Sequence, residues 1–255
     1  MAKVALVTGA GKGIGKGIAV TLAEAGFDIA VNYNASEGAA KDTVEQVTRL
    51  GRRAVLLRGN VQRLEEIDAM FREFDRHFDH LDVLVNNAGI TKFAHFLETT
   101  PQMFEEVINT DLRGLYFTSQ AAAKLMVQSG TKGVIVNISS NHAQGCWPRA
   151  TVYAAAKAGV NKLTMNMALD LSEYGIRVVG IAPGYTQLEW YTPEMIEKYV
   201  EKTSKKIPLG RFLTTAEVGK AVLFLVSEDA GYVTGTTLLM DGGALLPVVP
   251  DNRFM

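Results

Sequence analysis

Short apolar runs alternate along the chain with longer segments in which apolar residues recur every three or four positions. The short runs are rich in β-branched residues, and several are apolar throughout, which is typical of strands covered on both faces. We expect seven strands, at residues 3–8, 28–33, 54–58, 81–86, 133–139, 177–182 and 236–240. The longer segments predict helices with one buried face, and the clearest such face consists of Leu64, Ile67, Met70, Phe71, Phe74 and Phe78.

Strands that alternate with helices from end to end predict an α/β fold, a doubly wound parallel sheet with helices on both faces. Two long Ala-rich helices are expected at 101–128 and 152–173. No repeat or linker interrupts the pattern, so residues 1–255 are interpreted as a single domain. The pattern is weakest at 187–206, and a long polar insertion after a strand's carboxyl end is a natural lid over a site.

The composition narrows the class of protein and of partner. The 255 residues carry 26 basic and 27 acidic side chains, so the chain lacks the basic excess of a nucleic-acid-binding protein. A single cysteine, Cys146, excludes an intrachain disulfide and suits a reducing compartment. No apolar run approaches the ~18 residues of a membrane helix, and no His/Cys/Asp/Glu spacing indicates a metal site. We expect a soluble, cytoplasmic protein with a small-molecule substrate, and no nucleic-acid, membrane or metal partner.

A glycine-rich turn, TGAGKGIG from Thr8 to Gly15, joins the first strand to a helix. Glycines allow a tight turn and a close approach of backbone N–H groups to a pyrophosphate, and the helix N-terminus adds positive potential. In this strand–helix context the turn predicts a dinucleotide site that includes Gly9, Gly13 and Ile14. The alternative is an ordinary glycine-rich loop.

The end of the second strand bears on which dinucleotide is bound. An acidic residue there would accept hydrogen bonds from the adenosine ribose and repel a 2′-phosphate. This strand ends in Asn32-Tyr33-Asn34, without an acid, and Lys12 in the glycine turn is able to reach a 2′-phosphate as a point charge. Both observations favour NADP over NAD, although a solvated loop lysine would look the same in the sequence.

Tyr153 and Lys157 lie four residues apart in a predicted helix and therefore share one face. A tyrosine is a poor base at neutral pH, but a nearby ammonium and a positively charged nicotinamide both favour the phenolate. Tyr153 is then suited to take a proton from a hydroxyl, or to return it during reduction. Ser140, at the end of the fifth strand, is placed to hydrogen-bond the substrate oxygen.

Together these motifs resemble the short-chain dehydrogenase/reductase family over essentially the whole chain. The matching pieces are the turn at 8–15, Asn86-Asn87-Ala88-Gly89 after the fourth strand, Ser140, Tyr153-Ala-Ala-Ala-Lys157, and Pro183-Gly184 after the sixth strand. The resemblance implies a Rossmann-type sheet, a nicotinamide cofactor and Ser–Tyr–Lys chemistry. It also implies a homotetramer in which the two long helices pair between subunits.

The resemblance further implies individual cofactor contacts. Residues 87–89 would line the adenosine side, and Asn60-Val61 matches an Asp-Val that contacts adenine. Lys157 would also hold the nicotinamide ribose, and the backbone after Pro183-Gly184 would meet the carboxamide. The expected cofactor set is Gly9, Lys12, Gly13, Ile14, Gly15, Asn32, Asn34, Asn60, Val61, Asn87, Ala88, Gly89, Tyr153, Lys157, Pro183, Gly184 and Thr186.

Two positions depart from the family pattern. Where the family often has a catalytic Asn in an Asn-Leu-x-Gly setting, this chain has Asp111-Leu112-Arg113-Gly114. Asp111 either holds the same water near Lys157 in a proton relay or only fixes the helix backbone, and both roles fit a buried polar group. Leu188 stands where the family often has a Thr, so Thr186 is the expected substitute.

The segment between Ser140 and Tyr153 should border the substrate. Its Ser-x-His and Trp-Pro elements resemble bacterial glucose 1-dehydrogenases of this family, which implies a sugar or polyol contacted by Asn141, His142 and Trp147. A sugar site needs fixed polar groups beside an apolar platform, and these side chains supply both. The alternative is a loop histidine bonded to backbone and a tryptophan that only packs.

The sequence thus favours an NADP(H)-dependent oxidoreductase that acts on a secondary alcohol or ketone, and two other functions remain open. A 3-oxoacyl-(acyl carrier protein) reductase has a very similar pattern. However, Thr131 and Tyr174 stand where basic residues would dock the acidic carrier. The near-neutral net charge of the chain also gives little electrostatic attraction toward an acidic partner. A non-catalytic nicotinamide-nucleotide sensor would explain Asp111, but the intact Ser–Tyr–Lys set argues against it.

Overall fold

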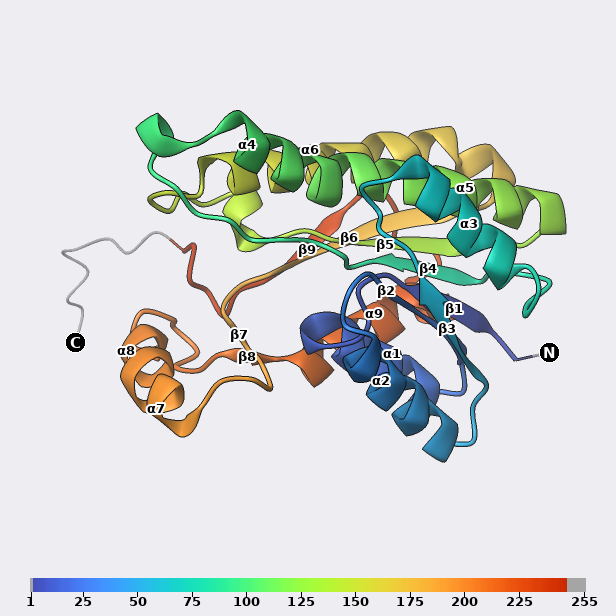
Figure 1. Ribbon diagram of the computed structural model, residues 1–255, viewed down its shortest axis with the longest axis horizontal. Helices are drawn as coiled ribbons and strands as arrows, with labels where there is room; N and C mark the ends of the chain where they lie inside the picture. Colours follow the sequence, from blue (N-terminus) through green and yellow to red (C-terminus); the bar gives the residue numbers. More distant parts are fainter. Residues whose placement is uncertain (1, 247–255) are drawn as a thin grey trace.

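The computed structural model describes residues 2–246, and its centre is a seven-stranded sheet in which every neighbouring pair is parallel (Figure 1). The strand order is β3-β2-β1-β4-β5-β6-β9. The strands are β1 (Val4–Val7), β2 (Asp28–Tyr33), β3 (Ala54–Arg58), β4 (Val83–Asn86), β5 (Val134–Ile138), β6 (Arg177–Pro183) and β9 (Thr237–Met240). Each corresponds to one predicted run, so the doubly wound α/β fold expected from the sequence is confirmed.

Helices cover both faces of this sheet (Figure 1). One layer contains α1 (Gly13–Glu24), α2 (Glu37–Arg49) and α9 (Thr215–Val226). The other contains α3 (Leu64–Phe74), α4 (Pro101–Ile108), α5 (Leu115–Ser129) and α6 (Thr151–Asp170). Within the described part of the chain, no helix is both long enough and apolar enough to cross a membrane.

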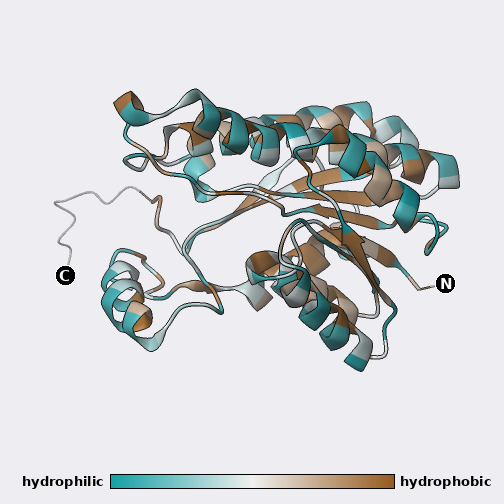
Figure 2. Cartoon of the chain, in the orientation of Figure 1, coloured by the Kyte–Doolittle hydropathy of each residue, from teal (hydrophilic) through white to brown (hydrophobic). Residues whose placement is uncertain are grey.

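Successive residues of the central strand β1 face opposite helical layers. Ala5 and Val7 belong to the apolar core shared with α1, α2 and α9, whereas Val4 and Leu6 belong to the core shared with α3, α5 and α6. All four are buried, because a parallel sheet between two helical layers has no solvated face. Figure 2 shows apolar strands between helices whose outer surfaces are largely polar.

The direction of winding changes between β1 and β4. From β1 the chain moves outward to β2 and β3, and from β4 it moves the other way through β5 and β6 to β9. The loops that leave the carboxyl ends of these two strands therefore diverge, and ligands of open parallel sheets bind in the crevice between such loops. The glycine turn follows β1 and residues 87–89 follow β4, so both motifs meet at this crevice.

The single helix expected at 101–128 is divided. α4 ends at Ile108, a π-helical turn occupies Asn109–Gly114, and α5 begins at Leu115. The expected stretch is thus helical throughout, but the spacing of apolar residues does not distinguish a regular helix from one that contains a single widened turn. The helix expected at 152–173 is α6, which is followed by a short 3₁₀ turn at Ser172–Tyr174.

The weakly patterned segment at 187–206 belongs to an excursion between two very short strands. β7 (Thr186–Gln187) pairs with β8 (Leu213–Thr214), and between them lie α7 (Pro193–Met195), a π-helical turn (Ile196–Val200) and α8 (Glu201–Ser204). Val200, Ile207 and Phe212 form a small apolar core of the excursion itself. Its two ends are thus anchored side by side, and its helices project away from the sheet (Figure 1).

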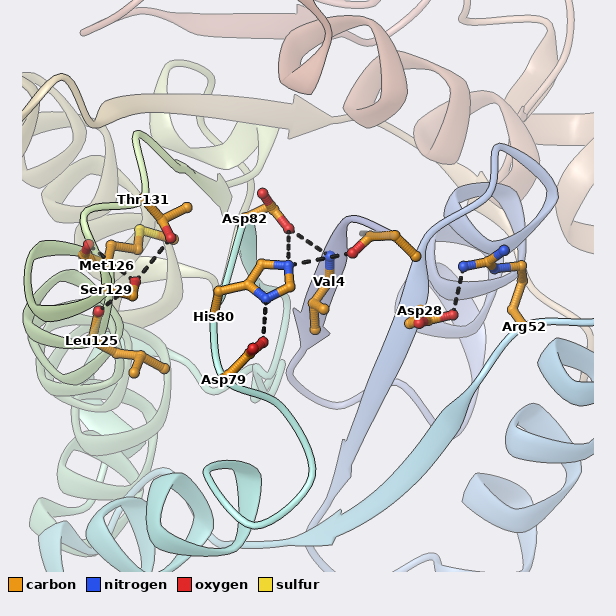
Figure 3. A network of polar contacts seen from close by, with 11 residues as sticks. Val4, Asp28, Arg52, Asp79, His80, Asp82, Leu125, Met126, Ser129 and Thr131 are labelled. Carbon is orange, nitrogen blue, oxygen red and sulfur yellow. Dashed lines mark hydrogen bonds and ion pairs between the residues drawn. The ribbon is translucent and has the colours of Figure 1, made fainter.

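At the amino ends of the strands, polar side chains link the segments that lead into β1 and β4 (Figure 3). The backbone N–H of Val4 donates to Asp82 Oδ2 at 2.7 Å, and His80 Nε2 lies 3.3 Å from the same oxygen. His80 Nδ1 lies 2.6 Å from Asp79 Oδ1, and this hydrogen bond raises the pKa of His80 above its ordinary value. The network lies far from the carboxyl ends of the strands and is part of the scaffold.

Candidate active site

The glycine turn has no side chains of its own over the backbone at Gly9, Gly13 and Gly15, where α1 starts. Gly9 and Gly13 have φ angles of +63° and +59°, a region that L side chains rarely adopt. A Cβ atom on Gly15 would collide with the side chain of Asn87 and the carbonyl oxygen of Gly9. The turn can therefore approach a diphosphate closely, and the backbone N–H groups of α1 point toward it.

Polar side chains on the neighbouring strand ends hold this turn in place. The hydroxyl of Thr8 accepts hydrogen bonds from the backbone N–H groups of Asn87 and Ala88, each at 3.0 Å. Asn32 Oδ1 accepts from the N–H of Gly9 at 3.1 Å, while its Nδ2 donates to the carbonyls at Leu57 and Gly59. The Asn32 amide is thus engaged inside the protein, whereas Asn34 is exposed at the rim.

A cavity of about 490 Å³ extends from the glycine turn across the ends of β2, β3 and β4. It brings together most of the expected cofactor residues: Gly9, Lys12, Gly13, Ile14, Asn32, Asn34, Asn60, Val61, Asn87, Ala88 and Gly89. An elongated cavity with a bare glycine turn in its wall fits a dinucleotide. Gly15 supports the turn from behind and is not in the wall.

A second cavity, of about 280 Å³, lies over the ends of β5 and β6 and contains Ser140, Tyr153 and Lys157. Ser140 follows β5, which ends at Ile138 and not at 139 as expected, and it caps a 3₁₀ turn. Its hydroxyl accepts from the backbone N–H of His142 at 3.2 Å and donates only a long bond of 3.4 Å to Asn141 Oδ1. The Ser140 hydroxyl is therefore readily redirected toward a ligand oxygen.

Lys157 is buried one helical turn after Tyr153 on α6. Its Nζ donates to the carbonyl of Ile138 at 3.0 Å and lies 5.7 Å from the centre of the Tyr153 ring. Burial acts to lower the pKa of Lys157, but the charges of Asp111 and Tyr153 outweigh it, so the net direction is upward. Lys157 is accordingly held as an ammonium beside the tyrosine.

Asp111 lies in the π-helical turn and is completely buried, with 1% of its surface exposed. Its Oδ1 accepts from the backbone N–H of Ile90 at 2.8 Å, and its Oδ2 lies 3.2 Å from Lys157 Nζ. Among residues 2–246, Oδ2 has no aligned hydrogen-bond donor, so its contact with Lys157 is an ion pair. Asp111 thus fixes the backbone after β4 and also faces the ammonium of Lys157.

An aromatic wall stands beside Tyr153. The ring of His142 stacks on the ring of Trp147, with centroids 4.1 Å apart and an interplanar angle of 15°. The ring of Phe93 also stacks on His142, with centroids 6.0 Å apart. Tyr153 meets His142 edge-on at 5.3 Å. Burial lowers the pKa of His142, and its buried Nδ1 has no hydrogen-bond partner in the described part of the chain. Trp147 Nε1 donates to the Tyr185 hydroxyl at 3.0 Å.

The remaining expected residues close the second cavity from the β6 side. Pro183, Gly184 and Thr186 all line it, and the Thr186 hydroxyl donates to the carbonyl of Gly184 at 3.1 Å. A Cβ atom on Gly184 would lie 2.7 Å from the Asp241 backbone, so only glycine fits there. The expected substrate residues Asn141, His142 and Trp147 do not line this cavity. His142 flanks it through its edge-on contact with Tyr153, and Trp147 lies behind, stacked on His142.

Sequence reasoning missed several residues of these walls. Leu188 lines both cavities, Trp190 lines the first and Tyr191 the second, although all three belong to the segment expected only as a lid. Gln62 and Thr110, which share a hydrogen bond of 2.7 Å, also line the first cavity. The aromatic residues in an otherwise polar insertion were the available signal.

Known proteins of the same fold are similar along nearly the whole chain. The model of a family described as “Enoyl-(Acyl carrier protein) reductase” matches residues 9–244. The 3-oxoacyl-[acyl-carrier-protein] reductase FabG of Staphylococcus aureus is 38% identical over 243 residues, which cover 95% of this chain and 98% of that protein. Glucose 1-dehydrogenase 2 of Bacillus subtilis is 37% identical over 247 residues, with 96% and 95% covered.

A solved structure supports the same assignment. The gluconate 5-dehydrogenase of Burkholderia cenocepacia, in complex with NADP and tartrate, is similar with a TM-score of 0.88, at 33% identity over 96% of both chains. Sequence motifs, sheet topology and relatives agree. The chain therefore belongs to the short-chain dehydrogenase/reductase family of oxidoreductases.

Proposed function

We propose that this protein uses NADP(H) to oxidise a secondary alcohol or reduce the corresponding ketone. The observation that carries the proposal is that Ser140, Tyr153 and Lys157 converge on a cavity adjoining the glycine-turn cavity. Ile14, Asn87, Gly89, Thr91 and Leu188 line both cavities. A dinucleotide that enters along the first cavity would therefore reach the side chains of the second.

Each catalytic side chain has one task in this proposal. A bound nicotinamide accepts or supplies the hydride. Tyr153 takes the hydroxyl proton of an alcohol, or returns a proton to the oxygen of a ketone. Lys157 favours the phenolate of Tyr153 through its charge and holds the nicotinamide ribose, while Ser140 donates a hydrogen bond that orients the substrate oxygen.

Asp111 is the fourth member of the proposed catalytic set. Its ion pair with Lys157 keeps that side chain charged, and its bond to the Ile90 N–H fixes the loop after β4. The two contacts use different carboxylate oxygens, so a role in proton transfer and a role in holding the backbone are compatible.

The charge of the first cavity supports NADP over NAD. Within residues 2–246, Lys12 is the only charged side chain in its wall. A wall of this kind accommodates a 2′-phosphate, whereas an acidic one would repel it. The gluconate 5-dehydrogenase that this chain resembles was solved with NADP.

A sugar or polyol is the proposed substrate. The stacked rings of His142 and Trp147 form a platform behind Tyr153, and the buried Nδ1 of His142 has no hydrogen-bond partner among the described residues. Asn141, buried next to Ser140, adds an amide. Two of the similar proteins are named as a glucose and a gluconate dehydrogenase. The alternative substrate is a 3-oxoacyl thioester, and the 38% identity to FabG supports it.

Initial rates of nicotinamide absorbance change test the proposal. The assay offers D-glucose with NADP⁺ and with NAD⁺, and acetoacetyl thioester with NADPH and with NADH. Turnover of glucose with NADP⁺ supports the sugar site. Turnover of the thioester alone supports the reductase. No turnover on a broad panel of alcohols and ketones, together with tight cofactor binding, would instead indicate a nucleotide sensor.

We also propose that several copies associate, as a homotetramer in the cytoplasm, each a single domain with a lid at 187–206. Apolar side chains are exposed on α5 and α6, with Val127 at 41%, Met165 at 52% and Leu169 at 75%. Exposed apolar helix faces of this kind are typical of protein interfaces. A monomeric mass in light scattering would contradict the assembly.

A further inference from the structure

A carboxylate from the lid segment occupies the start of the glycine-turn helix. The backbone N–H of Gly13, the first residue of α1, donates to Oε1 of Glu189 at 2.7 Å, across 176 residues of sequence. Among the described residues, α1 has no acidic side chain in its first turn and no side-chain cap at Lys12. Glu189 is therefore the anion that satisfies this helix N-terminus.

The neighbours of Glu189 cover the same spot. A Cβ atom on Gly13 would lie 3.1 Å from the ring of Trp190 and 3.6 Å from Leu188. The ammonium of Lys12 lies 5.5 Å from the centre of the Trp190 ring, a cation–π contact. Residues 188–190 thus lie over the glycine turn, and we call these three residues the clasp.

The clasp is built to open without disturbing the sheet. It follows β7, which is anchored to β8, and it closes with a turn in which the N–H of Tyr191 donates to the carbonyl of Leu188 at 3.0 Å. Glu189 and Trp190 are exposed on their outer side, so neither is held by packing against the core. Movement of this turn frees the Gly13 N–H.

We propose that Glu189 is an internal competitor for the diphosphate position of the dinucleotide site, so that cofactor binding requires the clasp to release Gly13. The inference rests on the proposed cofactor site. A diphosphate and a carboxylate both seek the same N–H groups at a helix N-terminus, and two anions cannot share one donor without strong repulsion. The apparent Kd is therefore the intrinsic Kd divided by the fraction of molecules in which the clasp is open.

Glu189→Gln tests this assignment, because the amide keeps the shape of the side chain but loses its charge. We expect the Kd for NADPH, measured by calorimetry, to fall by a factor on the order of three to ten. ADP, which carries a diphosphate, should show the same gain, whereas adenosine should bind both proteins equally. Glu194→Gln is the matched control, since Glu194 is an exposed acid of the same segment on α7.

Stopped-flow fluorescence of NADPH separates competition from simple repulsion. Release of the clasp precedes binding, so Glu189→Gln should raise the association rate constant and leave the dissociation rate constant unchanged. Glu189→Asp keeps the charge but is one methylene shorter, and it should also bind NADPH faster than the wild type. A change confined to dissociation, or wild-type association by Glu189→Asp, would overturn the proposal.

The outcomes distinguish this inference from the proposed function. If the wild type and Glu189→Gln bind NADPH equally well, the cofactor site stands and the competition is wrong. If neither binds NADPH, NADH or ADP, the cofactor site itself is wrong and the inference falls with it. If adenosine gains as much as ADP, the substitution has changed the fold and not the diphosphate position, which also overturns the assignment.

Discussion

Lys157 Nζ lies 3.2 Å from Asp111 Oδ2, and both side chains are almost fully buried, at 6% and 0% exposure. A buried ammonium without a counter-ion costs several kcal/mol, so the pair stabilises the charged form of Lys157 at the place where the chemistry needs it. The same pair moderates the field that Lys157 exerts on Tyr153. Asp111 thus balances the charge of the site as well as holding its backbone.

Asp111→Asn separates these two roles. The amide oxygen still accepts from the Ile90 N–H, but the buried ammonium of Lys157 loses its counter-ion, so the pKa of Lys157 falls. We expect the alkaline limb of the pH–rate profile, where Lys157 loses its proton, to move to lower pH. Rates between pH 6 and 10 measure the shift. An unchanged midpoint with a lower melting temperature would assign Asp111 a structural role only.

Tyr153→Phe removes the hydroxyl that transfers the proton and leaves the ring in place. We expect kcat to fall by about 10²- to 10⁴-fold, the usual contribution of a general acid–base. The Kd for NADPH should change little, because Lys157 and the glycine turn remain. Steady-state rates and calorimetry on the same preparation check both statements. Wild-type turnover would show that another group carries the proton.

Lys12→Ala removes the only charge in the wall of the first cavity that residues 2–246 supply. A charge-assisted bond to a phosphate is worth about 1.5–3 kcal/mol, so we expect a roughly tenfold or larger increase in the Kd for NADPH. The Kd for NADH, which has no 2′-phosphate, should change much less, and loss of the contact with Trp190 should if anything lower it by loosening the clasp. Lys162→Ala, an exposed lysine on α6, is the control. An equal loss for both dinucleotides would contradict the assignment of Lys12 to the 2′-phosphate.

His80 predicts how stability depends on pH. Its pKa is raised in the folded protein by the hydrogen bond to Asp79, so protonation favours folding. The stabilisation is fully present below about pH 6.5, the unfolded value, and is lost as the pH rises through the higher folded value. His80→Asn should therefore lower the free energy of unfolding at pH 5.5 by up to about 1 kcal/mol, and by less at pH 9.

Urea unfolding at the two pH values measures the His80 effect. His95→Asn is a suitable comparison, because the His95 ring contacts the backbone N–H of Leu97 and caps a surface turn. If His80→Asn lost more stability at pH 9 than at pH 5.5, protonation of His80 would oppose folding and the raised pKa would be wrong.

The sheet, and the meeting of Ser140, Tyr153 and Lys157 at one cavity, could be predicted because both depend on local patterns. β2 and β3 begin and end at the expected residues, since their apolar runs are flanked by polar and glycine positions. Tyr153 and Lys157 meet because a helix places residues four apart on one face. The cofactor cavity also follows from topology, as loops at the carboxyl ends of neighbouring parallel strands must adjoin.

Contacts that depend on side-chain orientation over long separations could not be predicted. The hydrogen bond from Trp147 Nε1 to the Tyr185 hydroxyl joins residues 38 apart, and no pattern in the sequence indicates it. Glu189 reaches Gly13 from a segment 176 residues away, and no spacing in the sequence reports such a contact. β5 ends at Ile138, one residue before the predicted end, and the extended backbone of Ser140 gives the sequence no sharp boundary there.

The π-helical turn at Asn109–Gly114 makes this part of the chain intolerant of changes in length. Such a turn holds one residue more than an α-helical turn, so deletion of one residue would restore a regular helix and rotate α5 by about 100° against α4. Ala122 and Met126 would then leave the core while Asp111 lost Lys157. Insertions and deletions within this lineage should therefore accumulate in surface loops such as the one after Gly130, and be purged from this turn.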